Sequence, residues 1–236
     1  MKKFKLFCFP YAGGSSVIYE KWRKELSPSI ELIPVEYAGR GTRFTTPPFT
    51  NINDVVEDAF HAIKKHLDTT SHYSFFGHSM GALIAYELSH KLIQLNFTAP
   101  VHIFFSGKLA PHIENEYKLI HNLEDIEFKE ELLKLGGTPR EALENKDWTK
   151  LFLPILRADF KAVEEYSYSK KNNTLPCDFT ILYGQDDLLT ANKIEEWQHH
   201  TKNKCTFSRF SGGHFFIANH VNEIVNVIND TLISKL

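Results

Sequence analysis

The stretch Tyr73–Leu88 reads YSFFGHSMGALIAYEL and contains an abrupt change of pattern. An apolar run typical of a buried strand stops at Gly77, and a helical pattern begins at about Met80. Ser79 lies at the corner between two glycines. Such a turn forces its central residue into strained backbone angles, and glycines on both sides leave room where side chains would clash. The corner therefore predicts a serine presented at the carboxyl edge of a sheet, in a Gly-x-Ser-x-Gly motif.

Short apolar runs alternate with helical patterns along the rest of the chain. The strand runs cover 4–9, 30–35, 72–77, 101–107, 178–184 and 205–210, and the helical patterns cover 17–26, 52–67, 80–95, 190–200 and 220–235. In 80–95, four apolar residues recur at helical spacing and are expected to face the sheet: Ile84, Leu88, Leu92 and Leu95. The alternation predicts an α/β fold with a mostly parallel sheet and helices on both faces.

One interval, from about 110 to 170, carries no strand pattern. Two helical stretches occupy it, DIEFKEELLKL and WTKLFLPILRADFKAVEEY, separated by Gly136-Gly137-Thr138-Pro139. The interval is either a long crossover on the sheet or a lid over a site, and its position between the fourth and fifth strand runs favours the lid. With 236 residues, we expect a single domain, 1–236, with a helical lid insertion at about 110–170.

The serine of the corner needs a base, because a hydroxyl at its ordinary pKa is a poor nucleophile. In hydrolases built on such a corner, an acid and then a histidine follow the serine, each at the end of a later strand. Asp186 and Asp187 end the run ILYGQDDLL. Gly-x-x-Asp spacing favours Asp187, whereas Asp186 is expected to cap or hydrogen-bond locally. His214 follows the last strand run in FSGGHFF, so the predicted catalytic residues are Ser79, Asp187 and His214.

Other polar residues near these motifs are expected to have structural roles. His78 is the neighbour of the serine, but the turn directs its side chain away from the site, so it is expected to be packed or hydrogen-bonded. His199 and His200 lie on a polar helical stretch and are expected to be solvated. Asp159 lies in the insertion and is expected to pair with Arg157 or to be solvated.

Two backbone N–H groups are predicted to bind the oxyanion of an acyl-transfer reaction. Met80 begins a helix, so its N–H has no helical partner and can donate to an oxyanion. The second donor should come from the loop after an early strand, which reads CFPYAGGSS. Pro10 ends the strand, and Gly13-Gly14 let the backbone pass close to a ligand. The N–H of Ala12 is the predicted donor, with an ordinary tight turn as the alternative reading of this loop.

Composition narrows the class of protein further. The net charge is −2 with no long basic run, so neither nucleic acid nor an anionic membrane is indicated as a partner. No run approaches the roughly 18 apolar residues of a membrane-spanning helix. The three cysteines are widely separated, which indicates neither a disulfide framework nor a metal site. We therefore expect a cytoplasmic, monomeric protein without a bound metal.

Taken together, these motifs resemble one family, the type II thioesterases of nonribosomal peptide and polyketide synthesis, which are α/β-hydrolases. The resemblance runs nearly end to end and rests on FPYAGG, EYAGRGTR, FGHSMGAL, LGGTP, LPILRADF, YGQDD and FSGGHFF. Many hydrolases share Gly-x-Ser-x-Gly, but the opening loop, the segment 39–41 and the insertion phrases are much more selective. One departure is Tyr37-Ala38, where a proline is expected before the glycine.

The resemblance implies an enzyme that removes misprimed or stalled acyl groups from the phosphopantetheine arm of carrier proteins. By position, the family's triad falls on Ser79, Asp187 and His214, its oxyanion donors fall on Ala12 and Met80, and its mobile lid is the insertion. Phosphopantetheine is part of the substrate, so the resemblance implies no cofactor.

Some alternatives stay open at this point. The same triad would serve a medium-chain fatty acyl-carrier-protein thioesterase or a small-ester carboxylesterase. A binding protein without turnover is disfavoured, because it would not need all three residues. Arg40 and Arg43 are either phosphate contacts or solvated loop arginines.

Overall fold

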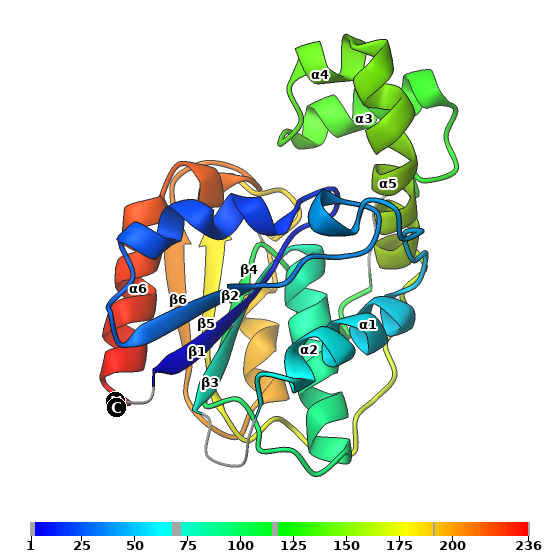
Figure 1. Ribbon diagram of the computed structural model, residues 1–236. Coiled ribbons are helices and arrows are strands. Elements are labelled where there is room, and N and C mark those ends of the chain that lie inside the picture. The colour runs from blue at the N-terminus through cyan, green and yellow to red at the C-terminus, as the bar shows by residue number, and fades with distance from the viewer. Residues whose placement is uncertain (1–2, 68–71, 115–117, 191, 236) are drawn as a thin grey trace.

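A six-stranded parallel sheet forms the centre of the molecule. The computed structural model describes residues 3–67, 72–114, 118–190 and 192–235. In these residues the strands are β1 (Phe4–Phe9), β2 (Ile30–Pro34), β3 (Tyr73–His78), β4 (His102–Ser106), β5 (Asp178–Gly184) and β6 (Cys205–Phe210). Their order is β2-β1-β3-β4-β5-β6, and every neighbouring pair is parallel (Figure 1). The predicted α/β fold is confirmed, and all six carboxyl ends meet at one edge.

Helices cover both faces of this sheet. On one face lie α1 (Ile52–Lys64), α2 (Met80–Gln94) and the 3-10 helix η3 (Ile194–His200), and on the other lie the 3-10 helix η1 (Ser16–Lys24) and α6 (Val221–Ile233) (Figure 1). Successive strand residues point to opposite faces, so that Phe75 packs with α1 and α2 while Phe76 packs with η1. Both faces are therefore apolar, as a sheet buried on both sides requires.

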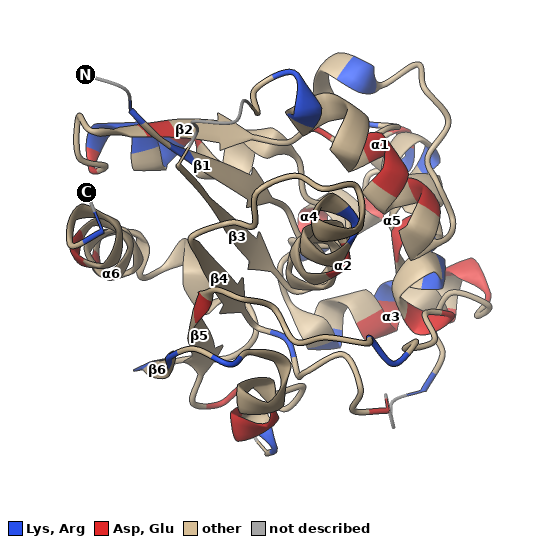
Figure 2. Cartoon of the chain, turned by 90° about the horizontal axis from the view of Figure 1, so that it is seen from below, with Lys and Arg blue, Asp and Glu red and all other residues tan. Residues whose placement is uncertain are grey.

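Charged side chains lie on the outer surfaces of the helices. Figure 2 shows acidic and basic residues interspersed, for example along α3 (Asp125–Leu135). No helix within the described ranges is both long and apolar enough to cross a membrane.

The insertion follows β4 and precedes β5. It contains α3, the short α4 (Arg140–Glu144) and α5 (Lys146–Glu164), and it stands above the carboxyl edge of the sheet (Figure 1). It has a small core of its own, made by Ile120, Phe128, Leu132, Leu143, Leu153 and Leu156. The sequence pattern missed α4 because five residues with one buried side chain, Leu143, are too few for a helical period. Residues 115–117 of the predicted interval lie outside the described residues.

In the two stretches predicted as helices, 17–26 and 190–200, the structure has the 3-10 helices η1 and η3 instead, and residue 191 lies outside the described residues. In η3 the buried residues are Ile194, Trp197 and His200, which are spaced by three. Tyr19 and Trp22 in η1 have the same spacing and lie in edge contact. A 3-10 helix has three residues per turn, so this spacing places the buried side chains in one row.

His200 is buried by that geometry, and the prediction that it is solvated is wrong. It is 6% exposed. Its Nδ1 lies 2.9 Å from the Tyr86 hydroxyl and its Nε2 lies 2.7 Å from Nδ1 of His112. The neighbouring His199 is exposed, as predicted, because it lies on the outer side of the same helix.

Leu95 also differs from its prediction. Ile84, Leu88 and Leu92 are fully buried, but α2 ends at Gln94, and Leu95 forms the C-cap and is 46% exposed. The end of the helix turns this side chain away from the row that faces the sheet.

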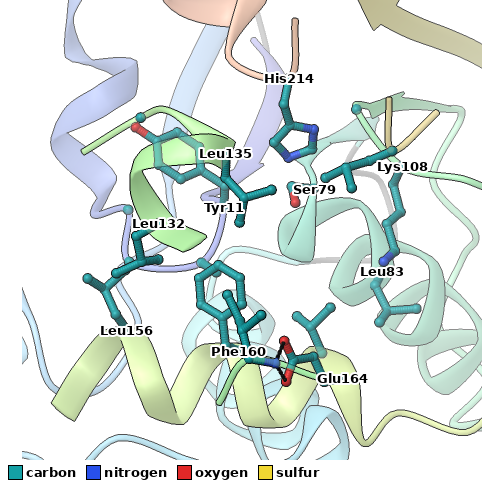
Figure 3. A pocket seen from close by; sticks show the side chains of 18 of the residues that line it. Tyr11, Ser79, Leu83, Lys108, Leu132, Leu135, Leu156, Phe160, Glu164 and His214 are labelled. Atoms are coloured by element: carbon teal, nitrogen blue, oxygen red, sulfur yellow. Dashed lines mark hydrogen bonds between the residues drawn. The ribbon is translucent and has the colours of Figure 1, made fainter. Parts of the chain in front are cut away.

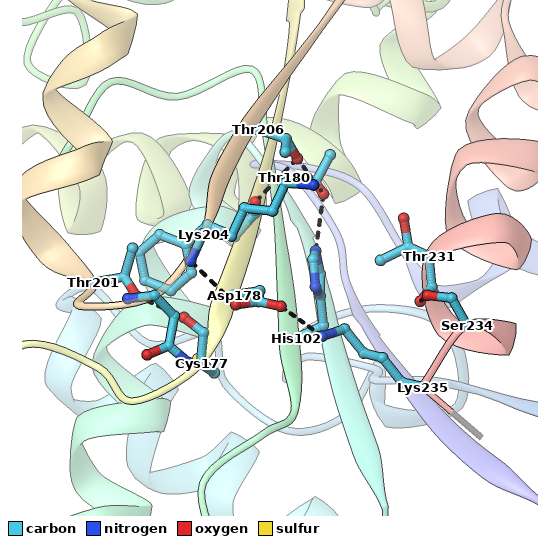
Figure 4. A network of polar contacts seen from close by, with 12 residues as sticks. His102, Cys177, Asp178, Thr180, Thr201, Lys204, Thr206, Thr231, Ser234 and Lys235 are labelled. Atoms are coloured by element: carbon cyan, nitrogen blue, oxygen red, sulfur yellow. Dashed lines mark hydrogen bonds and ion pairs between the residues drawn. The ribbon is translucent and has the colours of Figure 1, made fainter.

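A polar network closes the amino edge of the sheet, opposite the corner (Figure 4). His102 at the start of β4 makes a 2.8 Å hydrogen bond through Nε2 to the Thr180 hydroxyl, which lies 3.0 Å from the Thr206 hydroxyl. The Lys235 ammonium lies 2.6 Å from the Asp178 carboxylate. Burial, together with the Lys235 charge, lowers the pKa of His102 to about 3. The folded protein therefore holds His102 neutral.

We predict that acid destabilises the protein partly through His102. Between the unfolded pKa of about 6.5 and the folded value of about 3, only the unfolded chain binds this proton, so stability falls as pH falls. The contribution is up to about 1.4 kcal/mol per pH unit. His102→Gln keeps a hydrogen-bonding group but cannot titrate. Its free energy of unfolding in urea should depend less steeply on pH, by about that amount, between roughly pH 4 and 6.

His61→Gln, which removes an exposed histidine, is the matched control and should keep the wild-type slope. An unchanged slope in His102→Gln would show that His102 is protonated in the folded protein.

Candidate active site

Ser79 occupies the strained corner between β3 and α2. Its φ is 54° and its ψ is −114°, in the left-handed range that side chains rarely adopt. A Cβ on Gly77 would lie 2.1 Å from the carbonyl oxygen of Gly81, and a Cβ on Gly81 would lie 2.0 Å from that of Phe9. The Ser79 N–H donates to the Ser106 carbonyl at 2.7 Å. Positions 77 and 81 therefore have no room for a side chain, and the hydrogen bond anchors the corner to the end of β4.

Asp187 lies beyond the end of β5 and is 1% exposed. Its Oδ2 accepts hydrogen bonds from Nδ1 of His214 at 2.9 Å and from the Thr190 hydroxyl at 3.0 Å, and its Oδ1 accepts one from the Leu189 N–H at 3.0 Å. Because Nδ1 of His214 faces the carboxylate, the neutral imidazole carries its proton on Nδ1, and Nε2 is left as an acceptor.

Asp186 points away from this contact and is exposed. Its backbone N–H donates to the Gly212 carbonyl at 3.0 Å, which ties the loop after β5 to the loop that carries His214. The two loops approach so closely that a Cβ on Gly184 would lie 2.5 Å from the carbonyl oxygen of Gly213. Of the two adjacent aspartates, the structure brings only Asp187 to His214.

Ser79 and His214 face a common cavity of about 1130 Å³ (Figure 3). In that view the imidazole of His214 points toward the Ser79 hydroxyl. The wall also includes Tyr11 from the loop after β1 and Leu132 and Phe160 from the insertion. Two of the predicted residues, Ser79 and His214, therefore meet at one cavity, and the third, Asp187, is buried behind His214 and hydrogen-bonded to it.

The two predicted oxyanion donors lie on either side of this corner. Ala12 lines the cavity, and Met80 is the first residue of α2. The adjacent Gly13 N–H is already used, because it donates to the Asp159 carboxylate at 2.7 Å. Within the described residues, the N–H groups of Ala12 and Met80 donate to no other protein atom. Both are available to an oxygen beside Ser79.

His78 has the packed role predicted for it. It is fully buried, with Nδ1 2.8 Å from the Ser106 hydroxyl, and its ring centre lies 5.2 Å from that of His214. Burial, and then the neighbouring His214, hold the pKa of His78 well below its usual value. It stays neutral and adds no second positive charge behind His214.

Arg40 and Asp159 form a buried ion pair, so both predictions for Asp159 are wrong. The pair is bidentate, with Nη1 2.6 Å from Oδ2 and Nη2 2.8 Å from Oδ1. Arg40 is 3% exposed and Asp159 is 2% exposed. Arg40 also donates to the Gly14 carbonyl at 3.1 Å, and Gly13 donates to Asp159. One pair therefore joins the segment 39–41, the insertion helix α5 and the loop that carries Ala12.

The other arginines in these motifs also have carboxylate partners. Arg157 pairs with Asp125 at 2.7 Å, and Arg43 pairs with Asp58 through two contacts at 2.5 and 2.7 Å. Arg40 is therefore neither solvated nor free for a phosphate, and Arg43 is partly exposed but held by Asp58. Sequence spacing could not reveal the Arg40 contact, since its partner lies 119 positions away.

A second contact joins the insertion to the catalytic loop. Gly137 has φ of 81°, and a Cβ there would lie 2.3 Å from the ring of Phe215, the neighbour of His214. A Cβ on Gly13 would likewise lie 2.3 Å from the Leu156 side chain of α5. The glycines of LGGTP and FPYAGG thus allow the insertion to sit directly against both catalytic loops.

No group of three His, Cys, Asp or Glu side chains in the described part of the chain converges as metal ligands would.

Residues 4–232 match the family model described as Thioesterase domain. The chain belongs to this family. Linear gramicidin dehydrogenase LgrE of Brevibacillus parabrevis is 37% identical over 98% of this chain and 88% of its own length. The medium-chain S-acyl fatty acid synthase thioesterase of Rattus norvegicus is 33% identical over 93% and 84%. The crystal structure of ClbQ from the colibactin NRPS/PKS pathway has a TM-score of 0.94, with 36% identity over 99% and 98%.

Family membership settles the general chemistry. This thioesterase is a hydrolase of acyl thioesters, and its fold is the α/β-hydrolase fold of its structural neighbours.

We predict that breaking the Arg40–Asp159 pair from one side destabilises the thioesterase more than removing both charges. Arg40→Met leaves the Asp159 carboxylate buried with the Gly13 N–H as its remaining donor, which typically costs about 3–5 kcal/mol. Arg40→Met/Asp159→Leu removes the uncompensated charge and should recover part of that loss. Urea unfolding measures both values.

Arg43→Met is the control, because its ion pair with Asp58 is partly exposed and should contribute about 1 kcal/mol or less. If the double variant is no more stable than Arg40→Met, the pair is not coupled in this way.

Proposed function

We propose that this thioesterase clears acyl groups from the phosphopantetheine arms of carrier proteins in nonribosomal peptide or polyketide synthesis. It would act as a separate, type II enzyme on misprimed or stalled carriers. The likeness to ClbQ over nearly both whole chains supports the pathway class. The observation that carries the chemistry is the meeting of Ser79 and His214 at one cavity, with Asp187 hydrogen-bonded to His214 from behind.

The proposed reaction has two halves. Nε2 of His214 takes the proton from Ser79 as the serine oxygen attacks the thioester carbonyl, and Asp187 holds the imidazole tautomer and stabilises the imidazolium. The phosphopantetheine thiolate leaves readily, since a thiol pKa is near 8.5. The departing thiolate takes the proton from the His214 imidazolium. Neutral His214 then deprotonates water, which attacks the acyl-serine, and the same proton passes to the serine oxygen as the acid is released.

The negative charge on the tetrahedral oxygen needs donors that are in place before the reaction. The N–H groups of Ala12 and Met80 are the proposed pair, and each such donor is worth about 3–4 kcal/mol in other hydrolases. Ala12 is held through Gly13 by Asp159, so the position of one donor depends on the insertion.

The insertion is the proposed lid. Its side chains Leu132, Leu156 and Phe160 line the cavity, so an acyl chain bound at Ser79 would lie against them (Figure 3). A carrier protein that delivers the arm has to approach past these helices. The carrier is the proposed partner, and a cytoplasmic monomer is the proposed form; the three free cysteines agree with that compartment.

Two relatives suggest rival activities. The name of the rat relative indicates fatty acyl chains of medium length, and the name of the Brevibacillus relative indicates a redox reaction. A medium-chain fatty acyl thioesterase would use the same triad and differ only in the length of the acyl chain it prefers. The second would consume a nicotinamide cofactor, so oxidation of NADPH with an acyl-loaded carrier is the discriminating measurement.

We predict that the wild-type thioesterase removes acetyl and aminoacyl groups from a loaded carrier protein, whereas Ser79→Ala does not. Without the serine oxygen there is no acyl-enzyme, and the rate should fall by at least about 10³-fold. Intact mass of the carrier follows the reaction, and a trapped adduct on the enzyme identifies the nucleophile. Ser106→Ala, at a buried serine off the cavity, is the matched control for loss of a hydroxyl.

Clearance by Ser79→Ala at the wild-type rate would disprove the nucleophile. Preference for free medium-chain acyl thioesters over the carrier-bound form would favour the fatty acyl alternative.

We predict that Asp187→Asn slows clearance by roughly 10³–10⁴-fold, because an amide cannot hold the same tautomer of His214. Asp186→Asn should stay within about threefold of wild type, since only its backbone takes part in the loop contact. Steady-state rates on one acyl-carrier substrate compare the two variants. The reverse order would assign the acid to Asp186.

A further inference from the structure

Two lysines line the cavity and have no role in the proposed reaction: Lys118, which is exposed and lies 4.0 Å from Glu131, and Lys108, which is partly buried. Lys108 lies two residues beyond β4, at the same edge as the corner, and it lines the cavity together with Ser79 and His214. Its carbonyl accepts a 2.8 Å hydrogen bond from Nε1 of the fully buried Trp197, so its backbone is held in place. Figure 3 shows its side chain running down the cavity wall beside Leu83, opposite Tyr11.

The ammonium of Lys108 has no protein anion of its own. In the described ranges it makes no ion pair with a carboxylate, although the side chain is partly buried. Burial lowers the pKa of Lys108, and the charge of Asp187 opposes this only in part. Asp187 itself is occupied by His214, Thr190 and Leu189.

Two of the three glutamates on the cavity wall are already engaged, and the third, Glu114, is exposed and forms no ion pair with Lys108 in the described part of the chain. Glu164 accepts hydrogen bonds from the N–H groups of Ile120 and His121 and from Nδ1 of His121. Glu131 lies 2.9 Å from the ammonium of Lys134. The Lys108 ammonium, partly buried and without an ion pair among the described residues, is therefore placed to bind a negative charge that a ligand brings.

The position of Lys108 indicates which part of the substrate can bring a negative charge to its ammonium. The Ser106 carbonyl accepts the Ser79 N–H, and two residues extend at most about 7 Å, so Lys108 begins close to the nucleophile. The phosphate of phosphopantetheine lies at the far end of the arm, next to the carrier. Leu83, beside the Lys108 side chain, is 1% exposed and belongs to the first turn of α2, which places the ammonium within the cavity rather than at a carrier-facing surface.

We propose that Lys108 binds a carboxylate at the distal end of the acyl group and gives the enzyme a preference for dicarboxylic acyl thioesters. The inference rests on the proposed thioesterase reaction and adds its substrate class. Lys108 is a specificity residue here, since it contacts the far end of the acyl group and takes no part in proton transfer.

The experiment compares malonyl, succinyl and glutaryl groups on one carrier protein, each against the amide of the same length, with butyryl as a neutral reference. The amide has the shape of the carboxylate without its charge. In the wild type, kcat/KM should favour the acid over its amide by about tenfold to a hundredfold at one length, the range for a charged hydrogen bond. In Lys108→Met this ratio should fall to about one or below, with the butyryl rate kept within about threefold.

Two further variants sharpen the result. Lys108→Arg keeps the charge and should retain most of the ratio, whereas Lys134→Met removes an exposed lysine of the insertion and should leave the ratio at the wild-type value. The assignment would be overturned by a wild type that shows no preference for the acid at any length. It would also be overturned if Lys108→Met kept the wild-type ratio, or if folded Lys108→Met lost butyryl hydrolysis. Absence of Ser79-dependent butyryl hydrolysis in the wild type would instead overturn the proposed function.

Discussion

A serine held at positive φ between a strand and a helix is the constraint on which the rest of the structure depends. The conformation is costly, and it persists because its surroundings leave no alternative. Backbone atoms of Gly81 and Phe9 fill the space where side chains at 77 and 81 would lie. The tight contact with Phe9 also brings the end of β1 against the start of α2. The loop after β1 therefore begins beside Ser79, which is where a second oxyanion donor is needed.

The same parallel sheet explains why five separate loops can cooperate. In such a sheet all carboxyl ends share one edge, and β1, β3, β4, β5 and β6 are consecutive neighbours there. The loops after these strands carry Ala12, Ser79, Lys108, Asp187 and His214 respectively, which are the residues of the proposed site. Close backbone approach, as between Gly184 and Gly213, then replaces side-chain packing between loops. Precision at the site follows from strand register and needs little contribution from the loops themselves.

Much of this arrangement could be predicted from local pattern. The six strands, the corner and the order of Ser79, Asp187 and His214 follow from apolar periodicity and from the chain order of such hydrolases. Predictions of exposure were less successful. His200 and Asp159 were expected to be solvated or paired nearby, because a short polar stretch carries no sign of a distant partner. His200 is buried by a spacing of three that differs from the helical period, and Asp159 by Arg40 from 119 positions away.

Stability alone does not explain the buried Arg40–Asp159 pair, because an apolar pair of similar size often stabilises a fold equally well. The directional contacts of the pair fix the orientation of the segments that it joins. Asp159 accepts both the guanidinium of Arg40 and the N–H of Gly13, so one carboxylate fixes the rotation of α5 and the path of the loop that carries Ala12. Apolar packing is non-directional and could not set the direction of an N–H group to the accuracy that an oxyanion needs. A lid that moved as a rigid helix away from Arg40 would release this constraint on Ala12. On the proposed function, closing the insertion over an acyl group and aligning the Ala12 N–H would both depend on this one contact.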